Sequence, residues 1–130
     1  MIELSYVRVA TGTVEEATAR LENELRARGF GVLAHLAVHQ ILKEKINAVI
    51  PPVVILEVCS PRHAHVALET SREAALLLPC KITVSEEKGR TQIALQRPTT
   101  VLATLLPVPE LRPLGEEVET LLRAAVDASA

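Results

Sequence analysis

Apolar residues recur along the chain with two periods, and these periods divide it into short strands and amphipathic helices. Segment 53–58 is almost continuously β-branched or aliphatic, which is typical of a strand inside a sheet. Alternation places Val54, Leu56 and Val58 on one face, which we expect to meet the core. The opposite face mixes apolar groups with a carboxylate and a thiol, namely Val53, Ile55, Glu57 and Cys59.

Two helices are marked by signals at their ends. Thr13 and Glu16 form a capping box, and Gly29 follows as a helix-ending residue, so the pattern predicts a helix between them. Ser60 followed by Pro61 predicts the start of a second helix, which continues to Pro79 with a stripe of small residues.

The remaining elements follow from spacing. Strands are predicted over 2–9 and 32–39, and Cys80–Glu86 with Thr91–Gln96 forms a hairpin around Gly89. In 32–39, alternation groups Leu33, His35, Ala37 and His39 on one face. Helical spacing predicts short helices over 41–46 and 100–106 and a final amphipathic helix over 114–128.

The main elements run in the order β-α-β-β-α-β-β-α. Most strands are joined by short connections, so right-handed parallel crossovers cannot organise the sheet. We therefore predict a single α+β domain over residues 1–130, with a curved, mostly antiparallel sheet of about five strands and the helices on one face. Segment 41–50 is unusually apolar for a connection, and it must cover the core edge, a ligand or another subunit.

Composition excludes several classes of function. The chain has 130 residues with 48% hydrophobic content, but one Phe, one Tyr and no Trp, so it lacks the rings of a base-stacking nucleic-acid platform. Its net charge of −2 includes no basic run that could follow a phosphate backbone. The N-terminal residues are predicted to form a strand rather than a signal peptide, and no apolar run reaches about 20 residues, so we expect a cytoplasmic protein without membrane segments. Ten Arg against four Lys is compatible with a thermophilic source.

Reactive side chains gather around the central predicted strand. Cys59 lies between this strand and the helix that follows it, and Cys80 lies between that helix and the next strand. They are either a paired thiol site or two buried structural cysteines, and the second interpretation is favoured. His35, His39, Glu57 and Cys59 share the predicted non-core face, which we expect to carry ligand binding. One His with Glu57 and Cys59 could supply three metal ligands, but a subunit interface or partly wet face is favoured, so no metal is predicted.

Other candidate motifs carry less chemistry. His63 and His65 point about 200° apart on a helix, so they cannot chelate one ion together, and surface positions at the helix start are expected for both. The five glycines form no phosphate loop, and no serine lies in a nucleophile-elbow context. No cofactor is predicted.

One resemblance rests on two blocks of sequence. Residues 57–61 (Glu-Val-Cys-Ser-Pro), with Ala64 and Ala67 after them, and residues 77–80 (Leu-Leu-Pro-Cys) resemble the family catalogued as domain of unknown function 302. Ser60 stands where Asn is frequent in that family, and both residues can cap a helix. The resemblance covers most of the chain. It implies a sheet-and-helix domain similar to the TATA-binding-protein-like fold and a homodimer, and it implies no activity.

Three functional hypotheses remain open. The favoured one is a homodimeric small-ligand-binding or interaction module, whose sheet faces and segment 41–50 enclose a small apolar ligand or each other. The alternative is a thiol- or metal-dependent enzyme with Cys59 as reactive group, Glu57 or a His as proton partner and Cys80 as resolving thiol. The third is a structural subunit of a larger assembly. The sequence identifies no reaction and leans away from an enzyme.

Overall fold

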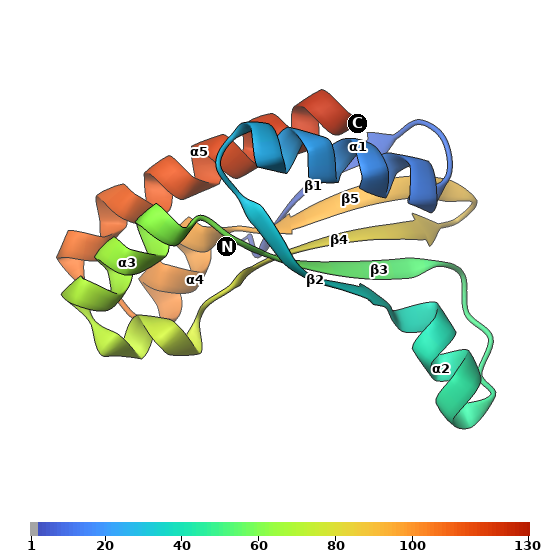
Figure 1. Ribbon diagram of the computed structural model, residues 1–130, viewed down its shortest axis with the longest axis horizontal. Helices are drawn as coiled ribbons and strands as arrows, with labels where there is room; N and C mark the ends of the chain where they lie inside the picture. The colour runs from blue at the N-terminus through green and yellow to red at the C-terminus, as the bar shows by residue number, and fades with distance from the viewer. Residues whose placement is uncertain (1–2) are drawn as a thin grey trace.

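The computed structural model describes residues 3–130, which fold into a twisted sheet with helices packed against it (Figure 1). The strands are β1 (Ser5–Ala10), β2 (Gly31–Ala37), β3 (Val53–Cys59), β4 (Cys80–Glu87) and β5 (Arg90–Gln96). The helices are α1 (Val14–Ala27), α2 (Val38–Ile46), α3 (Pro61–Thr70), α4 (Pro98–Leu105) and α5 (Arg112–Ser129), with 3-10 turns η1 (Arg72–Leu76) and η2 (Pro109–Leu111).

The sheet has the order β1-β5-β4-β3-β2, and every neighbouring pair is antiparallel. This confirms the predicted α+β class and the five-stranded sheet. The predicted hairpin is β4–β5, and its turn residues Lys88 and Gly89 both have positive φ, at 51° and 76°. That conformation matches the twist of a tight hairpin, and Gly89 adopts it without steric penalty.

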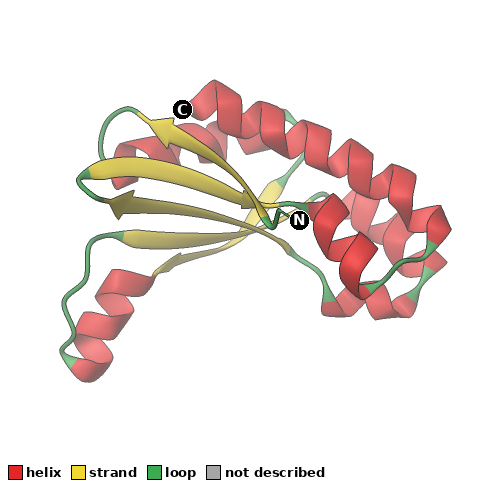
Figure 2. Ribbon diagram, turned by 180° about the vertical axis from the view of Figure 1, so that it is seen from behind, coloured by secondary structure: helices red, strands yellow, loops and turns green. Residues whose placement is uncertain are grey.

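Helices α1 and α5 cover one face of the sheet and pack against each other (Figure 2). The capping box of α1 is present: Thr13 Oγ1 accepts from the Glu16 N–H at 3.1 Å, and Glu16 Oε1 accepts from the Thr13 N–H at 2.9 Å. The core between this helix layer and the sheet is almost entirely aliphatic. Its fully buried members include Leu21, Leu25, Phe30, Leu56, Ile82, Ile93, Leu95 and Leu122.

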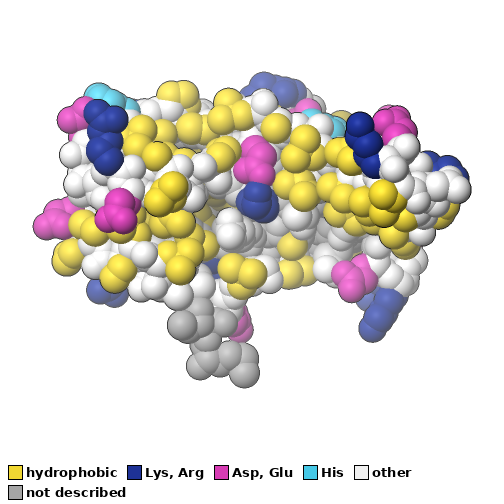
Figure 3. Space-filling model, turned by 90° about the horizontal axis from the view of Figure 1, so that it is seen from below, with side chains coloured by type: hydrophobic (Ala, Val, Ile, Leu, Met, Phe, Trp, Pro, Cys, Tyr) yellow, Lys and Arg dark blue, Asp and Glu magenta, His cyan; other side chains and the backbone are white. Residues whose placement is uncertain are grey.

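Within residues 3–130, no helix covers the other face of the sheet, which we call the open face. An apolar band crosses all five strands there, because the register joins Leu36, Ile55, Thr83, Ala94 and Val7 in consecutive pairs. Figure 3 shows apolar side chains spread across this side of the molecule. Helix α2 projects beyond the sheet on this side, away from α1 and α5 (Figure 1).

Several predicted boundaries need correction. Val38 and His39 begin α2 rather than ending β2. The helix that starts after Ser60 ends at Thr70, and the chain then forms η1 instead of one continuous helix to Pro79. The strand predicted from Ile2 begins at Ser5, and Ile2 lies outside the described residues. In the described part of the chain, no helix has the length and apolar character needed to cross a membrane.

Candidate functional site

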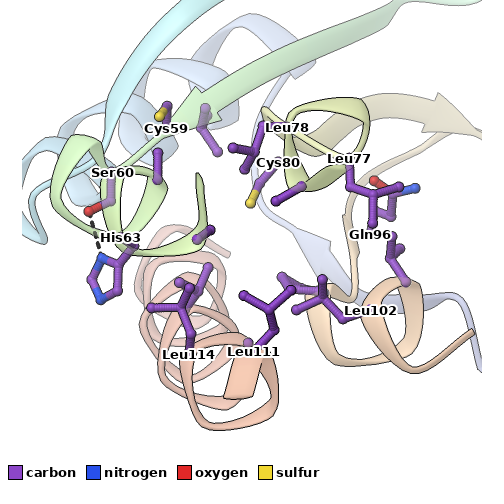
Figure 4. A pocket seen from close by; sticks show the side chains of 18 of the residues that line it. Cys59, Ser60, His63, Leu77, Leu78, Cys80, Gln96, Leu102, Leu111 and Leu114 are labelled. Carbon is purple, nitrogen blue, oxygen red and sulfur yellow. Dashed lines mark hydrogen bonds between the residues drawn. The ribbon is translucent and has the colours of Figure 1, made fainter. Parts of the chain in front are cut away.

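A cavity of about 80 Å³ lies at one end of the sheet, beyond the main core (Figure 4). Its walls come from α3, η1, α4 and α5, and its floor from the ends of β3, β4 and β5. The side chains are mostly aliphatic. Those that form the walls include Leu77, Leu78, Val101, Leu102, Leu111 and Leu114.

Small residues leave this space open. Ala67 of α3 and Ala74 of η1 are buried beside Leu111, and these three residues form an apolar cluster separate from the main core. Gly115 allows α5 to approach α4 closely, because a Cβ there would lie 2.8 Å from Cδ1 of Leu102. The small side chains of this region therefore leave the space between the walls unfilled.

A buried histidine lies at one end of the cavity. His63 is only 7% exposed, its ring stacks on Phe30 with centroids 6.3 Å apart, and its Nδ1 lies 2.6 Å from Oγ of Ser60. Its Nε2 has no hydrogen-bond partner among residues 3–130, and the exposed carboxylate of Glu117 stands 3.5 Å away. In Figure 4 the Ser60 hydroxyl turns toward this ring and away from the centre of the cavity.

This geometry corrects two expectations. Ser60 is the N-cap residue of α3, but its side chain makes no hydrogen bond to the helix backbone and contacts His63 instead. His63 is buried rather than on the surface. Its spacing contained the signal, since His63 is four residues before Ala67 and so belongs to the buried stripe of α3.

The two thiols line the same cavity, and the pKa of each is raised. The Cys80 sulfur points toward its centre, opposite Leu102 and Leu111, and Cys59 lies near its edge (Figure 4). Burial raises the pKa of Cys80 to about 11, with smaller contributions from Cys59 and Glu57, and burial also raises the pKa of Cys59. Since the thiolate is the reactive form, a raised pKa is opposite to what an activated nucleophile needs.

The predicted face of His35, His39, Glu57 and Cys59 forms only in part, since Glu57 and Cys59 share the open side of β3 but the two histidines lie elsewhere. A bulge between Val32 and Ala34 shifts the register of β2, so that Ala34 pairs with Glu57 and His35 pairs with the core residue Leu56. His35 therefore lies on the helix-covered side, where its Nδ1 is 3.0 Å from Oε1 of Glu22 in α1. The sequence carried no visible signal for this bulge.

The other members of that predicted set also have separate partners. His39 belongs to α2, and its Nδ1 accepts a hydrogen bond from the Val53 N–H at 3.1 Å. Glu57 lies on the open face and pairs with Lys81 on the neighbouring strand. Among residues 3–130, no group of three or more His, Cys, Asp or Glu side chains is placed to hold a metal ion.

A buried carboxylate, which the sequence analysis did not identify, fixes the cavity wall formed by α4. Glu119 of α5 accepts hydrogen bonds from the Thr99 N–H at 3.1 Å, from the Thr99 hydroxyl at 2.5 Å, and from Nε of both Arg97 and Arg123 at 3.0 Å. Burial alone would raise the pKa of Glu119, but the bonds from Thr99 and Arg97 outweigh it and hold the pKa below its ordinary value. Its position three residues before Leu122, on the apolar stripe of α5, was a usable signal.

Comparison with known proteins places the chain in a family. A solved structure, the crystal structure of an uncharacterized conserved protein DUF302 from Bacillus stearothermophilus, is 33% identical, with a TM-score of 0.93 and coverage of 98% of both chains. No curated protein matches the chain. The family model described as domain of unknown function DUF302 matches residues 6–129. The chain therefore belongs to the DUF302 family, as its Cys59-Ser60-Pro61 and Leu-Pro-Cys80 segments suggested.

Proposed function

We propose that the protein is an interaction module that forms a homodimer through the open face and an adjacent arm, defined as residues 38–52. One observation carries the proposal: in the described chain, none of the nine residues of α2 is buried. A helix of this length has little stability alone in water, and α2 makes its main contact only with β3. Packing against a partner would supply the missing burial.

The arm exposes the side chains that such a partner would cover. Ile46 is 69% exposed and Val49 is 80% exposed, and Ile41 and Ile50 are also open to solvent. Isolated exposed apolar residues are common, but a group beside an apolar sheet face is typical of an interaction surface. Segment 41–50 was the part of the sequence with more apolar residues than a connection needs, and its exposure supports the same interpretation.

The charges of the open face suit a second copy of the same chain. Glu57 and Lys81 form a neutral cross-strand pair beside the apolar band. A two-fold axis near this pair would bring each carboxylate toward the partner copy's ammonium group, so the surface is compatible with itself. A partner of strong single-sign charge would find no complementary field here.

The area of the open face indicates why a stable dimer would also need the arm. Five strands spaced about 4.8 Å apart and about 20 Å long give a flat area on the order of 400–500 Å². A standard stable interface buries about 800 Å² per partner. The open face alone falls short of that value, so the arm must contribute for the dimer to be stable.

The alternative, a thiol-dependent enzyme, has less support. Cys59 and Glu57 share one face of β3, but the Glu57 carboxylate is paired with Lys81, which leaves it less available as a proton acceptor for the thiol. The pKa of each thiol moves upward, which is opposite to the direction that an activated nucleophile requires. These observations favour binding over thiol chemistry.

Sedimentation velocity tests the dimer. At tens of micromolar, we expect the wild type at twice the 14.1 kDa chain mass and the double variant Ile46→Asp, Ile50→Asp at one chain mass. Leu76→Asp is the matched control, because Leu76 is 83% exposed on η1, far from the arm, and should leave the dimer intact. A monomeric wild type, or a double variant that stays dimeric, would overturn the proposal.

A further inference from the structure

We infer that the cavity between α3, η1, α4 and α5 binds the end of a neutral alkyl chain. This site is separate from the arm and adjoins only the end of the open face, through Cys59 and Gln96, and alkyl binding requires no dimer. Protein interiors are normally packed to crystal density, and an unfilled apolar space lowers stability. A single larger side chain at Ala67 or Ala74 would fill this one, yet both positions hold alanine.

The lining defines the chemistry of the occupant. The surface is nearly all apolar, with leucine, valine and alanine as its most frequent side chains, and the Cys80 thiol that points inward is uncharged at neutral pH. Within residues 3–130, the lining includes no Lys, Arg, Asp or Glu side chain, so a charged group inside would have no ion-pair partner there and would lose its hydration, which is strongly unfavourable. The occupant is therefore hydrocarbon over the part that enters.

The size of the cavity limits how much enters. An apolar protein cavity of about 150 Å³ accommodates benzene. A cavity of about 80 Å³ has roughly half that space, so it accepts about three or four carbon atoms and leaves the rest of the molecule outside. This points to the end of an alkyl chain rather than a ring.

A route for the chain exists without unfolding the core. Leu77, Leu78, Val101, Leu102 and Leu114 are only partly buried, so the walls reach solvent. The residues behind the cavity, such as Val58 and Val118, are buried in the main core. A chain can thus enter from the solvent side, and its polar head can stay in water.

Nitrogen-15 NMR titration with straight-chain alcohols from ethanol to hexanol tests the site. Each buried CH₂ group should tighten binding about fourfold until the cavity is full at about three or four carbons, after which affinity should level off. The saturable shifts should fall on α3, η1, α4 and α5. Shifts spread over the open face, or no saturable shift with any alcohol, would overturn the inference.

Two cavity-filling variants locate the binding. Ala67→Leu and Ala74→Leu should each weaken butanol binding at least tenfold, while Val66→Leu, which enlarges an exposed position on α3, should not change it. Unchanged affinity in a folded filling variant would place the alcohol elsewhere and contradict the inference. If neither filling variant folds, the positions of the wild-type shifts decide the question alone.

Discussion

The buried carboxylate of Glu119 gives the most specific test of how the helices are joined. Glu119→Gln keeps the size of the side chain but replaces one carboxylate oxygen by an NH₂ group. The remaining oxygen can still accept from Thr99, whereas the NH₂ group would face the donors of Arg97 and Arg123. The variant therefore loses two charge-assisted hydrogen bonds and gains a repulsive contact.

The size of the loss follows from these contacts. A hydrogen bond to a charged group contributes about 1.5–3 kcal/mol when it is well shielded. Side chains of Arg97 and Arg123 remain 24% and 37% exposed, so water weakens both interactions. We expect Glu119→Gln to lower the free energy of unfolding by about 2–3 kcal/mol at pH 7.

The pH dependence of this loss of stability shows whether the charge of Glu119 causes it. The folded-state pKa of Glu119 is lowered, so the folded protein holds this proton less tightly than the unfolded chain does. The stabilisation is complete above the unfolded pKa of about 4.3 and disappears as the pH falls through the lower folded value. The glutamine variant has no such ionisation. The difference in free energy of unfolding between the wild type and the variant should therefore become smaller at acid pH.

Urea unfolding followed by circular dichroism, at one fixed protein concentration and from pH 7 to 3.5, measures this gap. Glu116→Gln is the control, since Glu116 lies on the same helix, is 59% exposed and forms an ion pair with Arg112 on the helix surface. It should change stability by less than about 0.5 kcal/mol. A gap below about 1 kcal/mol at pH 7, a gap that does not change with pH, or an equal loss in the control would refute the reasoning.

Two further predictions use the same methods. Leu21 is fully buried between α1 and the sheet, so Leu21→Ala should lower the free energy of unfolding by about 2–5 kcal/mol, and a loss under about 1 would contradict the packing of α1. Because the pKa of Cys80 is about 11, its thiolate population at pH 8 is about two orders of magnitude below that of a free cysteine. Native thiol titration with a disulfide reagent should therefore show slow reaction of both cysteines compared with the urea-unfolded chain, and a rapidly reacting Cys59 would restore the enzyme hypothesis.

Regular alternation predicted the sheet well where a strand is central. β3 has neighbours on both edges and an unbroken register, so the alternation of Val54, Leu56 and Val58 places all three in the core as predicted. β2 is an edge strand, and its bulge reverses the faces of the residues beyond Val32. One inserted residue thus moved His35 away from the open face, because side chains alternate with a period of two.

The buried polar residues show a different limit. His63 and Glu119 both lie on apolar stripes of their helices, so their burial could have been predicted from spacing alone. Two of their partners could not, because Phe30 and Arg97 reach them only through the packing of separate elements, whereas Ser60 is three residues before His63. The cavity is also a product of that packing, since it depends on how far apart the helices stand rather than on the pattern within any one of them.

The arm and the cavity lie at opposite ends of one strand, β3. β3 starts at the arm, where Val53 donates to His39, and ends at the cavity, where Cys59 contributes to the wall. Seven residues of strand separate these ends by about 20 Å. Substitutions in the arm and in the cavity walls are that far apart and share no side-chain partner, so their effects are independent. Variants of the arm that abolish the dimer should therefore still bind an alkyl chain in the cavity, and each proposal can be refuted without refuting the other.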